Sequence, residues 1–131
     1  MIGPSTNQAS YRYQNDPAWL KSEKAIARTA FDAARDRELH EVIQKAKQMA
    51  NEIRQSSDLR DLEHYLTERR KEIDRKYDYR YSRLMQVFGR LLYEGRVTAE
   101  DLSGLHDNKL KSIRSLAEFL AKHAAEDDSE A

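Results

Sequence analysis

The middle third of the chain, from Asp58 to Glu94, predicts one long, highly charged helix with a narrow apolar stripe. No glycine or proline interrupts it before Gly89, and Gly95 is a natural C-terminal cap. At 1.5 Å per residue such a helix would be about 55 Å long. Because a compact domain of 131 residues is narrower than that, the stripe needs a second chain to cover it. The sequence therefore predicts association, as an elongated homodimer, before it predicts any chemistry.

The composition favours an elongated helical protein over one with a deep core. Charged residues make up 35% of the chain and hydrophobic residues 39%. The 23 basic and 23 acidic residues cancel, so no overall field attracts nucleic acid or an anionic membrane. The absence of cysteine excludes disulfides and thiolate chemistry. No apolar run approaches the roughly 20 residues of a membrane span, and the start lacks a signal-peptide pattern, so we expect a cytoplasmic protein.

Apolar residues recur mostly at steps of three and four, and no segment alternates with period two, so we predict an all-α fold. We expect two long helices and a small helical head, about four helices in all, in a single domain over residues 16–123. The predicted helices cover residues 17–54, 58–94, 99–105 and 108–123. We expect the first segment, 1–15, and the acidic last segment, 124–131, to be disordered.

Polar residues at the predicted helix starts support these boundaries. Asp16 before Pro17 is a typical helix start, and Ser57 can cap the second helix. Thr98 and Asp101 resemble a capping box that opens the short third helix. The two long helices carry the apolar residues that we expect at the dimer interface. These are Leu39, Val42, Ile43, Ala46, Leu66, Ile73 and Tyr77.

The second helix carries the run Arg70-x-Glu72-Ile73-Asp74-x-Lys76-Tyr77-Asp78-x-Arg80-x-Ser82. This run resembles the fluorescence recovery protein family, the regulators of the orange carotenoid protein. The resemblance covers roughly residues 17–118 without a gap. It implies an all-helical homodimer that binds the photoactivated carotenoid protein and hastens its return to the resting orange form. It also implies no cofactor and no catalysis.

The resemblance also implies which residues contact the partner, and several of these positions depart from the family pattern. Arg60 stands where the family typically has a tryptophan, and Glu63-His64 stands where it has a His-Asp pair. Arg70 is retained. In the head, Gln86 stands where the family typically has an aromatic residue, and Ser112 stands where it has a basic one. We therefore interpret the chain as a divergent homologue, with an origin outside the cyanobacteria as one alternative, and expect weak action on the carotenoid protein.

Several of these residues can also be explained without a functional role. Arg70 can instead be a surface arginine paired with Asp74, and the basic run at residues 69–71 is better explained as a solvated helix face than as a phosphate contact. The histidines show no metal-ligand spacing. Tyr77, Tyr79 and Tyr81 alternate around a helix and would not form one patch. The alternatives for function are a helical homodimer of the same fold bound to an unrelated protein, and a nucleic-acid-binding dimer, which the even mix of charge disfavours.

Overall fold

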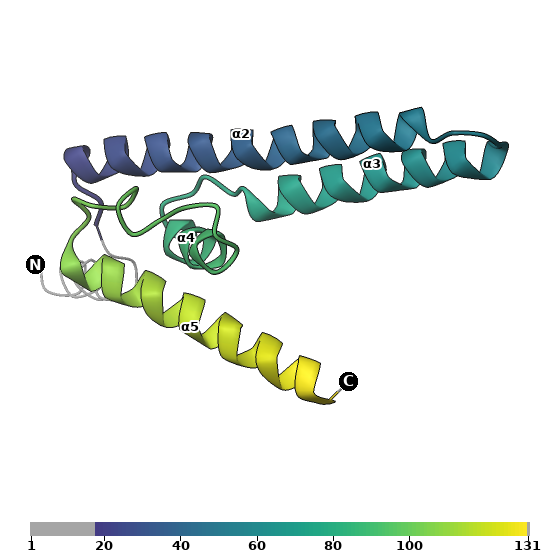
Figure 1. The fold of residues 1–131 in the computed structure, drawn as a ribbon. Helices are drawn as coiled ribbons and strands as arrows, with labels where there is room; N and C mark the ends of the chain where they lie inside the picture. Colours follow the sequence, from purple (N-terminus) through teal and green to yellow (C-terminus); the bar gives the residue numbers. More distant parts are fainter. Residues whose placement is uncertain (1–17, 131) are drawn as a thin grey trace, which may run out of the picture.

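The fold is a long helical hairpin with a small head packed near the start of its first helix (Figure 1). The computed structural model of the protein describes residues 18–130, and the side chains of residues 18–126. Within that range the helices are α2 (Lys21–Asn51), α3 (Ser56–Lys76), α4 (Leu84–Tyr93) and α5 (Asp107–Glu130). Residues 18–130 contain no strand, so the all-α prediction is confirmed.

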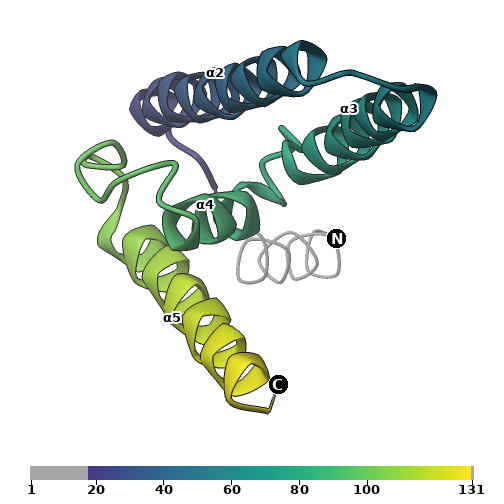
Figure 2. The same ribbon diagram turned by 45° about the vertical axis from the view of Figure 1, so that its right-hand side comes forward.

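The hairpin consists of α2 and α3, which run antiparallel and pack side by side (Figures 1 and 2). α3 begins with its first turn held by Asp58, whose Oδ2 accepts hydrogen bonds from the backbone N–H groups of Arg54 (3.0 Å) and Gln55 (3.3 Å). The prediction that Ser57 caps this helix is wrong, because α3 already begins at Ser56. Gln55 is the N-cap instead, and Asp58 in the first turn accepts its backbone N–H as the third helical residue of a capping box does.

The prediction of one unbroken helix over residues 58–94 is also wrong. α3 ends at Lys76 and α4 begins at Leu84. Between them residues 77–80 have no regular secondary structure and residues 81–83 form a turn; we call residues 77–83 the link. The link redirects the chain, so that α4 lies beside the hairpin instead of continuing α3 (Figure 1). The long stripe is therefore covered in part by this chain's own head.

The reason for the break lies in the alternating tyrosines of the link. Outside a helix, side chains two residues apart are no longer held about 200° apart around an axis, so the three rings can reach the same neighbours. The ring of Tyr79 contacts Phe31 of α2 edge-to-face at 4.8 Å between centroids, and Tyr77 contacts the same ring at 5.4 Å. Tyr81 continues the row, 5.7 Å from Tyr79 and 5.9 Å from Trp19. The three tyrosines thus do form one patch, which the helical reading excluded.

The head is built by α4 packing closely against α5 (Figure 2). Gly89 lies at the crossing, where a Cβ atom would come within 2.5 Å of Leu116 Cδ2. Gly89 therefore permits the approach of the two helices. Beyond α4, Gly95 has a φ of 75° and caps the helix as predicted. The fully buried side chains around this crossing are Leu84, Phe88, Leu91, Leu102 and Ile113.

The short helix predicted over residues 99–105 does not form. Its capping box does: the N–H of Thr98 donates to Asp101 Oδ2 at 2.9 Å, and the N–H of Asp101 donates to Thr98 Oγ1 at 3.1 Å. The chain then continues in turns instead of a helix. Gly104, with a φ of 102°, redirects it and lies against Ile26 of α2. The capping hydrogen bonds form, but they are followed by turns that return the chain to α2, and not by a helix.

The ends of the first and last helices differ from the prediction. α2 begins at Lys21 instead of residue 17 and ends at Asn51 instead of residue 54. Residues 18–20 are not helical, and the predicted start at Asp16-Pro17 lies outside the described residues, as does the segment 1–15. The last helix, α5, extends to Glu130, beyond the predicted end at residue 123, and the expected disorder of the acidic segment stays a prediction.

Candidate functional site

A buried carboxylate, Glu38 on α2, ties the hairpin to the link and the head. Its side chain is fully buried. Oε2 accepts hydrogen bonds from Lys76 Nζ at 2.8 Å and from Arg69 Nη2 at 2.9 Å. Oε1 accepts the phenol of Tyr77 at 2.8 Å and lies 3.2 Å from Nε of Arg96. A buried charge is stable only when paired and hydrogen-bonded, and here four donors from three segments meet on one carboxylate.

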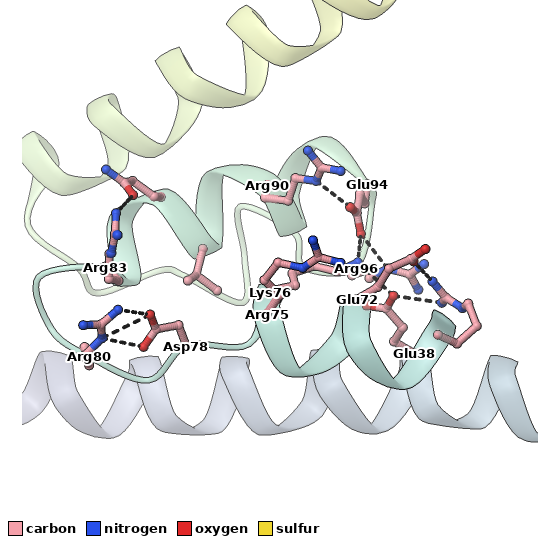
Figure 3. Close-up of a pocket in the computed structure, with 13 residues that line it drawn as sticks. Glu38, Glu72, Arg75, Lys76, Asp78, Arg80, Arg83, Arg90, Glu94 and Arg96 are labelled. Atoms are coloured by element: carbon pink, nitrogen blue, oxygen red, sulfur yellow. Dashed lines mark hydrogen bonds and ion pairs between the residues drawn. The ribbon is translucent and has the colours of Figure 1, made fainter. Parts of the chain in front are cut away.

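A second carboxylate, Glu94 at the C-terminus of α4, shares two of these cations. Its Oε1 accepts hydrogen bonds from Lys76 Nζ at 2.7 Å and Arg96 Nε at 2.8 Å, and its Oε2 accepts one from Arg90 Nε at 2.8 Å. We call Glu38, Glu94, Lys76, Arg96 and Tyr77 the ionic hub. It fixes how the end of α3 and the end of α4 meet the middle of α2 (Figure 3).

The hub shifts the pKa of several of its groups. Burial alone would raise the pKa of Glu38, but hydrogen bonds from Lys76 and Tyr77 hold it below the ordinary value. Burial opposes ionisation of Glu94 as well, yet its three cationic partners lower its pKa to about 2. Burial and the adjacent Glu38 raise the pKa of Tyr77 above its usual range. Both carboxylates are therefore ionised at neutral pH, and the phenol keeps its proton.

An open groove of about 870 Å³ lies beside the hub, between the end of α3, the link and α4 (Figure 3). Seven of its lining residues are basic and four are acidic. We call it the cationic groove. Its basic residues are Arg69, Arg75, Lys76, Arg80, Arg83, Arg90 and Arg96. Helix positions alone did not predict this grouping, because the link places Arg80 and Arg83 in the lining of the same groove as Arg75.

A second buried ion pair attaches the head to the start of α2. Glu23 is 2% exposed, and its Oε1 accepts hydrogen bonds from Lys109 Nζ at 3.1 Å and from the N–H of Leu20 at 3.0 Å. Its Oε2 accepts the N–H of His106 at 2.8 Å. Burial opposes ionisation of Glu23, but these donors lower its pKa. One side chain thus caps α2 and holds the segment before α5.

The predicted partner-contacting residues are all exposed, but the structure does not bring them together. Arg60, Glu63 and His64 lie in the first half of α3, toward the tip of the hairpin away from the head (Figure 1). Gln86 on α4 lines the cationic groove, where its Oε1 accepts a hydrogen bond from Arg83 at 3.0 Å. Ser112 lies on α5. Recognition through all of them would therefore need a partner that spans the hairpin and the head.

Arg70 is exposed, and the alternative pairing with Asp74 is not among the ion pairs of the described residues. Its neighbour Arg69 instead binds Glu38 and Glu72. Arg70 is thus free to contact a partner. The residues of the described range form no cluster of three or more potential metal ligands, and no helix within it is long and apolar enough to cross a membrane.

The residues expected at the dimer interface divide into two groups. Ile43 is 50% exposed and Leu66 is 41% exposed. Leu39, Val42 and Ala46 are partly buried. Ile73 and Tyr77 are buried inside the protomer, at 3% and 9% exposure. The structure therefore gives these two a role in the core of the single chain, because the head and the link cover the second half of the predicted stripe.

Comparison with known proteins identifies the family. A model of the photoprotection regulator fluorescence recovery protein family matches residues 19–117. The fluorescence recovery protein of a Synechocystis species is 39% identical over 99 residues, which cover 76% of this chain and 91% of the relative. The chain belongs to the fluorescence recovery protein family.

Solved structures of family members have the same fold. The fluorescence recovery protein of Fremyella diplosiphon matches with a TM-score of 0.75 and 38% identity, over 77% of this chain and 99% of that one. The Synechocystis structure matches with a TM-score of 0.74 and 39% identity, over the same shares. The family match ends at residue 117, whereas α5 of this family member continues to Glu130.

Sequence reasoning found the family but missed the ionic hub and the cationic groove. Glu38, Lys76 and Glu94 lay in segments that carried the resemblance, without an assigned role, and Tyr77 was expected at the dimer interface. The available signal was the alternation of Tyr77, Tyr79 and Tyr81, which in a helix would divide the three rings between different sides. A break in the helix at that point would have separated α3 from α4.

Proposed function

We propose that this family member is a non-enzymatic, homodimeric, cytoplasmic regulator that binds the photoactivated orange carotenoid protein and accelerates its return to the resting form. The observation that carries the proposal is the family match over residues 19–117, joined to solved fluorescence recovery protein structures that align over 99% of their length. Membership in a photoprotection regulator family supports action on a protein partner. Binding would involve no cofactor, membrane or nucleic acid.

The mechanism is preferential binding to one conformation of the partner. A protein that binds two states of its partner with different affinity changes their populations by the difference in binding free energy. If the more tightly bound state is the transition state, the rate of return rises in the same way. The exposed face of α3 with Arg60, Glu63, His64 and Arg70 is one contact surface, and Gln86 and Ser112 on the head are a second. Because no side chain has to react, exposed residues with rigid helical backbones are sufficient for this task.

The homodimer would use the apolar side chains that the hairpin leaves exposed. Ile43 and Leu66 are about half exposed, and Leu59 is 57% exposed. Glu38 contacts Arg69 across the antiparallel pair, so Ile43 and Leu66 lie at a similar level along the hairpin. Burying each such side chain contributes roughly 1.5 to 3 kcal/mol. Leu39, Val42 and Ala46 would extend this surface, whereas Ile73 and Tyr77 would support it from within the protomer.

The experiment is a relaxation assay. A photoconverted orange carotenoid protein is allowed to return from red to orange in the dark, with and without the protein, and the rate is followed by absorbance. The proposal expects a faster return that saturates with added protein. Binding is measured in parallel by size-exclusion chromatography under illumination and in darkness. No binding to either form would exclude the carotenoid protein as partner.

A second candidate is a homodimer of the same fold that binds an unrelated protein. The favouring observation is that Arg60, Glu63 and His64 are exposed and replace the residues typical of the family's working face, while the buried scaffold is retained. This candidate expects a stable dimer and no change in the relaxation rate, even for variants with the family-typical residues restored.

A further inference from the structure

The acidic residues of the cationic groove are already neutralised within the protein. Glu38 and Glu94 are engaged by the cations of the ionic hub. Glu72 pairs with Arg69, and Asp78 pairs with Arg80. One of the basic residues, Arg96, also pairs with Glu41 outside the lining. With seven basic and four acidic lining residues, the groove keeps an excess of two positive charges (7 − 4 − 1) after every carboxylate has a partner.

The remaining two cations line the groove without an ion pair. Arg75, on the last turn of α3, is exposed and has no hydrogen bond or ion pair within the described residues. Arg83, just before α4, donates a hydrogen bond to the neutral amide oxygen of Gln86 at 3.0 Å, and its charge helps to lower the pKa of Asp78, which is already paired with Arg80. Their guanidinium groups come from different elements and line the same concavity (Figure 3). Guanidinium groups form paired hydrogen bonds with carboxylates.

The ionic hub makes this excess a fixed property of the site. Lys76 is held by two carboxylates and Arg96 by three, so both side chains are fixed in place. The link that carries Arg80 and Arg83 is fastened by the tyrosine contacts to Phe31. A binding surface with its cations already ordered loses less conformational entropy when a ligand binds.

The shape and charge favour an acidic peptide over nucleic acid or a single phosphate. The chain has no net charge, and a nucleic-acid surface needs a broad basic face. An open groove of about 870 Å³ with arginines along its length is larger than one phosphate requires. Arginines spread over the end of α3, the link and α4 suit several carboxylates spaced along an extended chain.

We infer that the cationic groove is a docking site for a carboxylate-rich segment of a protein partner, bound through Arg75 and Arg83. This surface is separate from the exposed apolar residues of the hairpin that the proposed homodimer uses. The proposed ligand class does not depend on which protein the partner is, because it follows only from the charges and geometry of the groove.

The test is fluorescence anisotropy with a fluorescein-labelled hexaglutamate peptide and the full chain at low salt. The double variant Arg75→Gln/Arg83→Gln should weaken binding by about tenfold or more, because two charge-assisted contacts are lost. The matched control is Arg35→Gln/Arg114→Gln, which removes the same charge from exposed positions on α2 and α5. The control should bind the peptide as the unmodified protein does. Circular dichroism checks that both variants remain helical.

Several outcomes would overturn the inference. Equal weakening in the control variant would show that only overall charge matters. Tighter binding of a labelled DNA duplex than of the peptide, lost in the groove variant, would assign the groove to nucleic acid. Displacement of the peptide by millimolar inorganic phosphate at constant ionic strength would assign it to phosphate. Absence of peptide binding at low salt would leave the groove without the proposed ligand class.

Discussion

The phenol of Tyr77 donates a 2.8 Å hydrogen bond to Oε1 of the buried Glu38. Tyr77 is the first residue after α3, and Glu38 lies in the middle of α2. This contact marks the point where the chain leaves the hairpin and enters the link. The ring of Tyr77 packs on Phe31, which lies about two turns from Glu38 along α2, so one side chain supplies both an apolar and a polar attachment of the link.

We predict that Tyr77→Phe lowers the free energy of unfolding by about 2 kcal/mol, because a buried hydrogen bond to a charged acceptor is lost while the ring is kept. Urea unfolding followed by circular dichroism measures the change. The control is Tyr93→Phe, which removes a phenol from a side chain that is 38% exposed. Equal effects of the two substitutions would contradict a special role for the contact with Glu38.

The sequence predicted the helix class and the family but not the shape of the head. Apolar spacing located α2, α3 and α5 because apolar residues recur at three- and four-residue steps along each of them, although α3 buries only Ile73 in the protomer. It did not locate the end of α3, because Ile73, Tyr77 and Leu84 keep the spacing of a helix through the break. Only packing of Tyr79 on Phe31 decides against a helix there, and that contact joins residues 48 positions apart (79 − 31), which local spacing does not report.

The site residues also divide into those that the sequence could indicate and those that depend on contacts between distant segments. Exposed residues such as Arg60 and His64 could be proposed from resemblance alone. Glu38 gave no signal, since a single glutamate in a helix is usually solvated, and its burial depends on Lys76 and Arg96 arriving from other elements. The cationic groove depends on the link in the same way.

Glu94 predicts a specific loss of stability in acid. Its pKa is lowered from 4.5 to about 2 in the folded protein. The folded state therefore binds the proton less tightly than the unfolded chain, and the stabilisation is complete above about pH 4.5 and is lost as the pH falls toward 2. We expect Glu94→Gln to be less stable at pH 7, by on the order of 2 to 3 kcal/mol. Its stability should also fall less steeply between pH 4.5 and 2.

The measurement is the unfolding free energy in urea at several pH values over that range. Glu118→Gln, an exposed change on α5, is the control and should follow the unmodified protein. Parallel pH profiles for Glu94→Gln and the unmodified protein would show that this carboxylate is not linked to folding. The lowered pKa of Glu38 adds a loss in the same direction, so the profile of Glu94→Gln should become flatter but not flat.

The two glycines with positive φ give a matched pair. At Gly95 a Cβ atom would meet no atom within 4 Å, whereas at Gly104 it would lie 2.5 Å from Ile26 Cδ1. Gly95→Ala should cost about 1 kcal/mol for the left-handed backbone. We expect Gly104→Ala to cost more, because α2 or its isoleucine must also move. Thermal unfolding of both variants ranks them, and a smaller loss for Gly104→Ala would show that the isoleucine yields freely.

Ile43 tests the proposed dimer interface. Its side chain is 50% exposed in the protomer, so Ile43→Glu places a charge in the proposed interface without disturbing the core. We expect a folded monomer, because an unpaired charge buried between two chains is strongly unfavourable. Light scattering coupled to size-exclusion chromatography gives the mass. Gln44→Glu, the adjacent exposed residue on another side of α2, should leave the dimer unchanged, and an intact dimer of Ile43→Glu would remove this residue from the interface.

The recognition face of α3 gives the last prediction. We expect the unmodified protein to accelerate carotenoid-protein recovery only weakly, because Arg60, Glu63 and His64 replace the family-typical residues. The triple change Arg60→Trp, Glu63→His and His64→Asp should increase the relaxation rate, since all three positions are exposed and the substitutions leave the core intact.

The readout is the red-to-orange relaxation rate at equal protein concentrations, with the mass of each variant checked by light scattering. The control is the same triple change combined with Arg70→Ala. It should lose the gain if Arg70 contributes to the same face. Strong acceleration by the unmodified protein would show that positions 60, 63 and 64 do not control recognition. If neither version changes the rate although both remain dimers, the result would favour the same fold bound to a different protein partner.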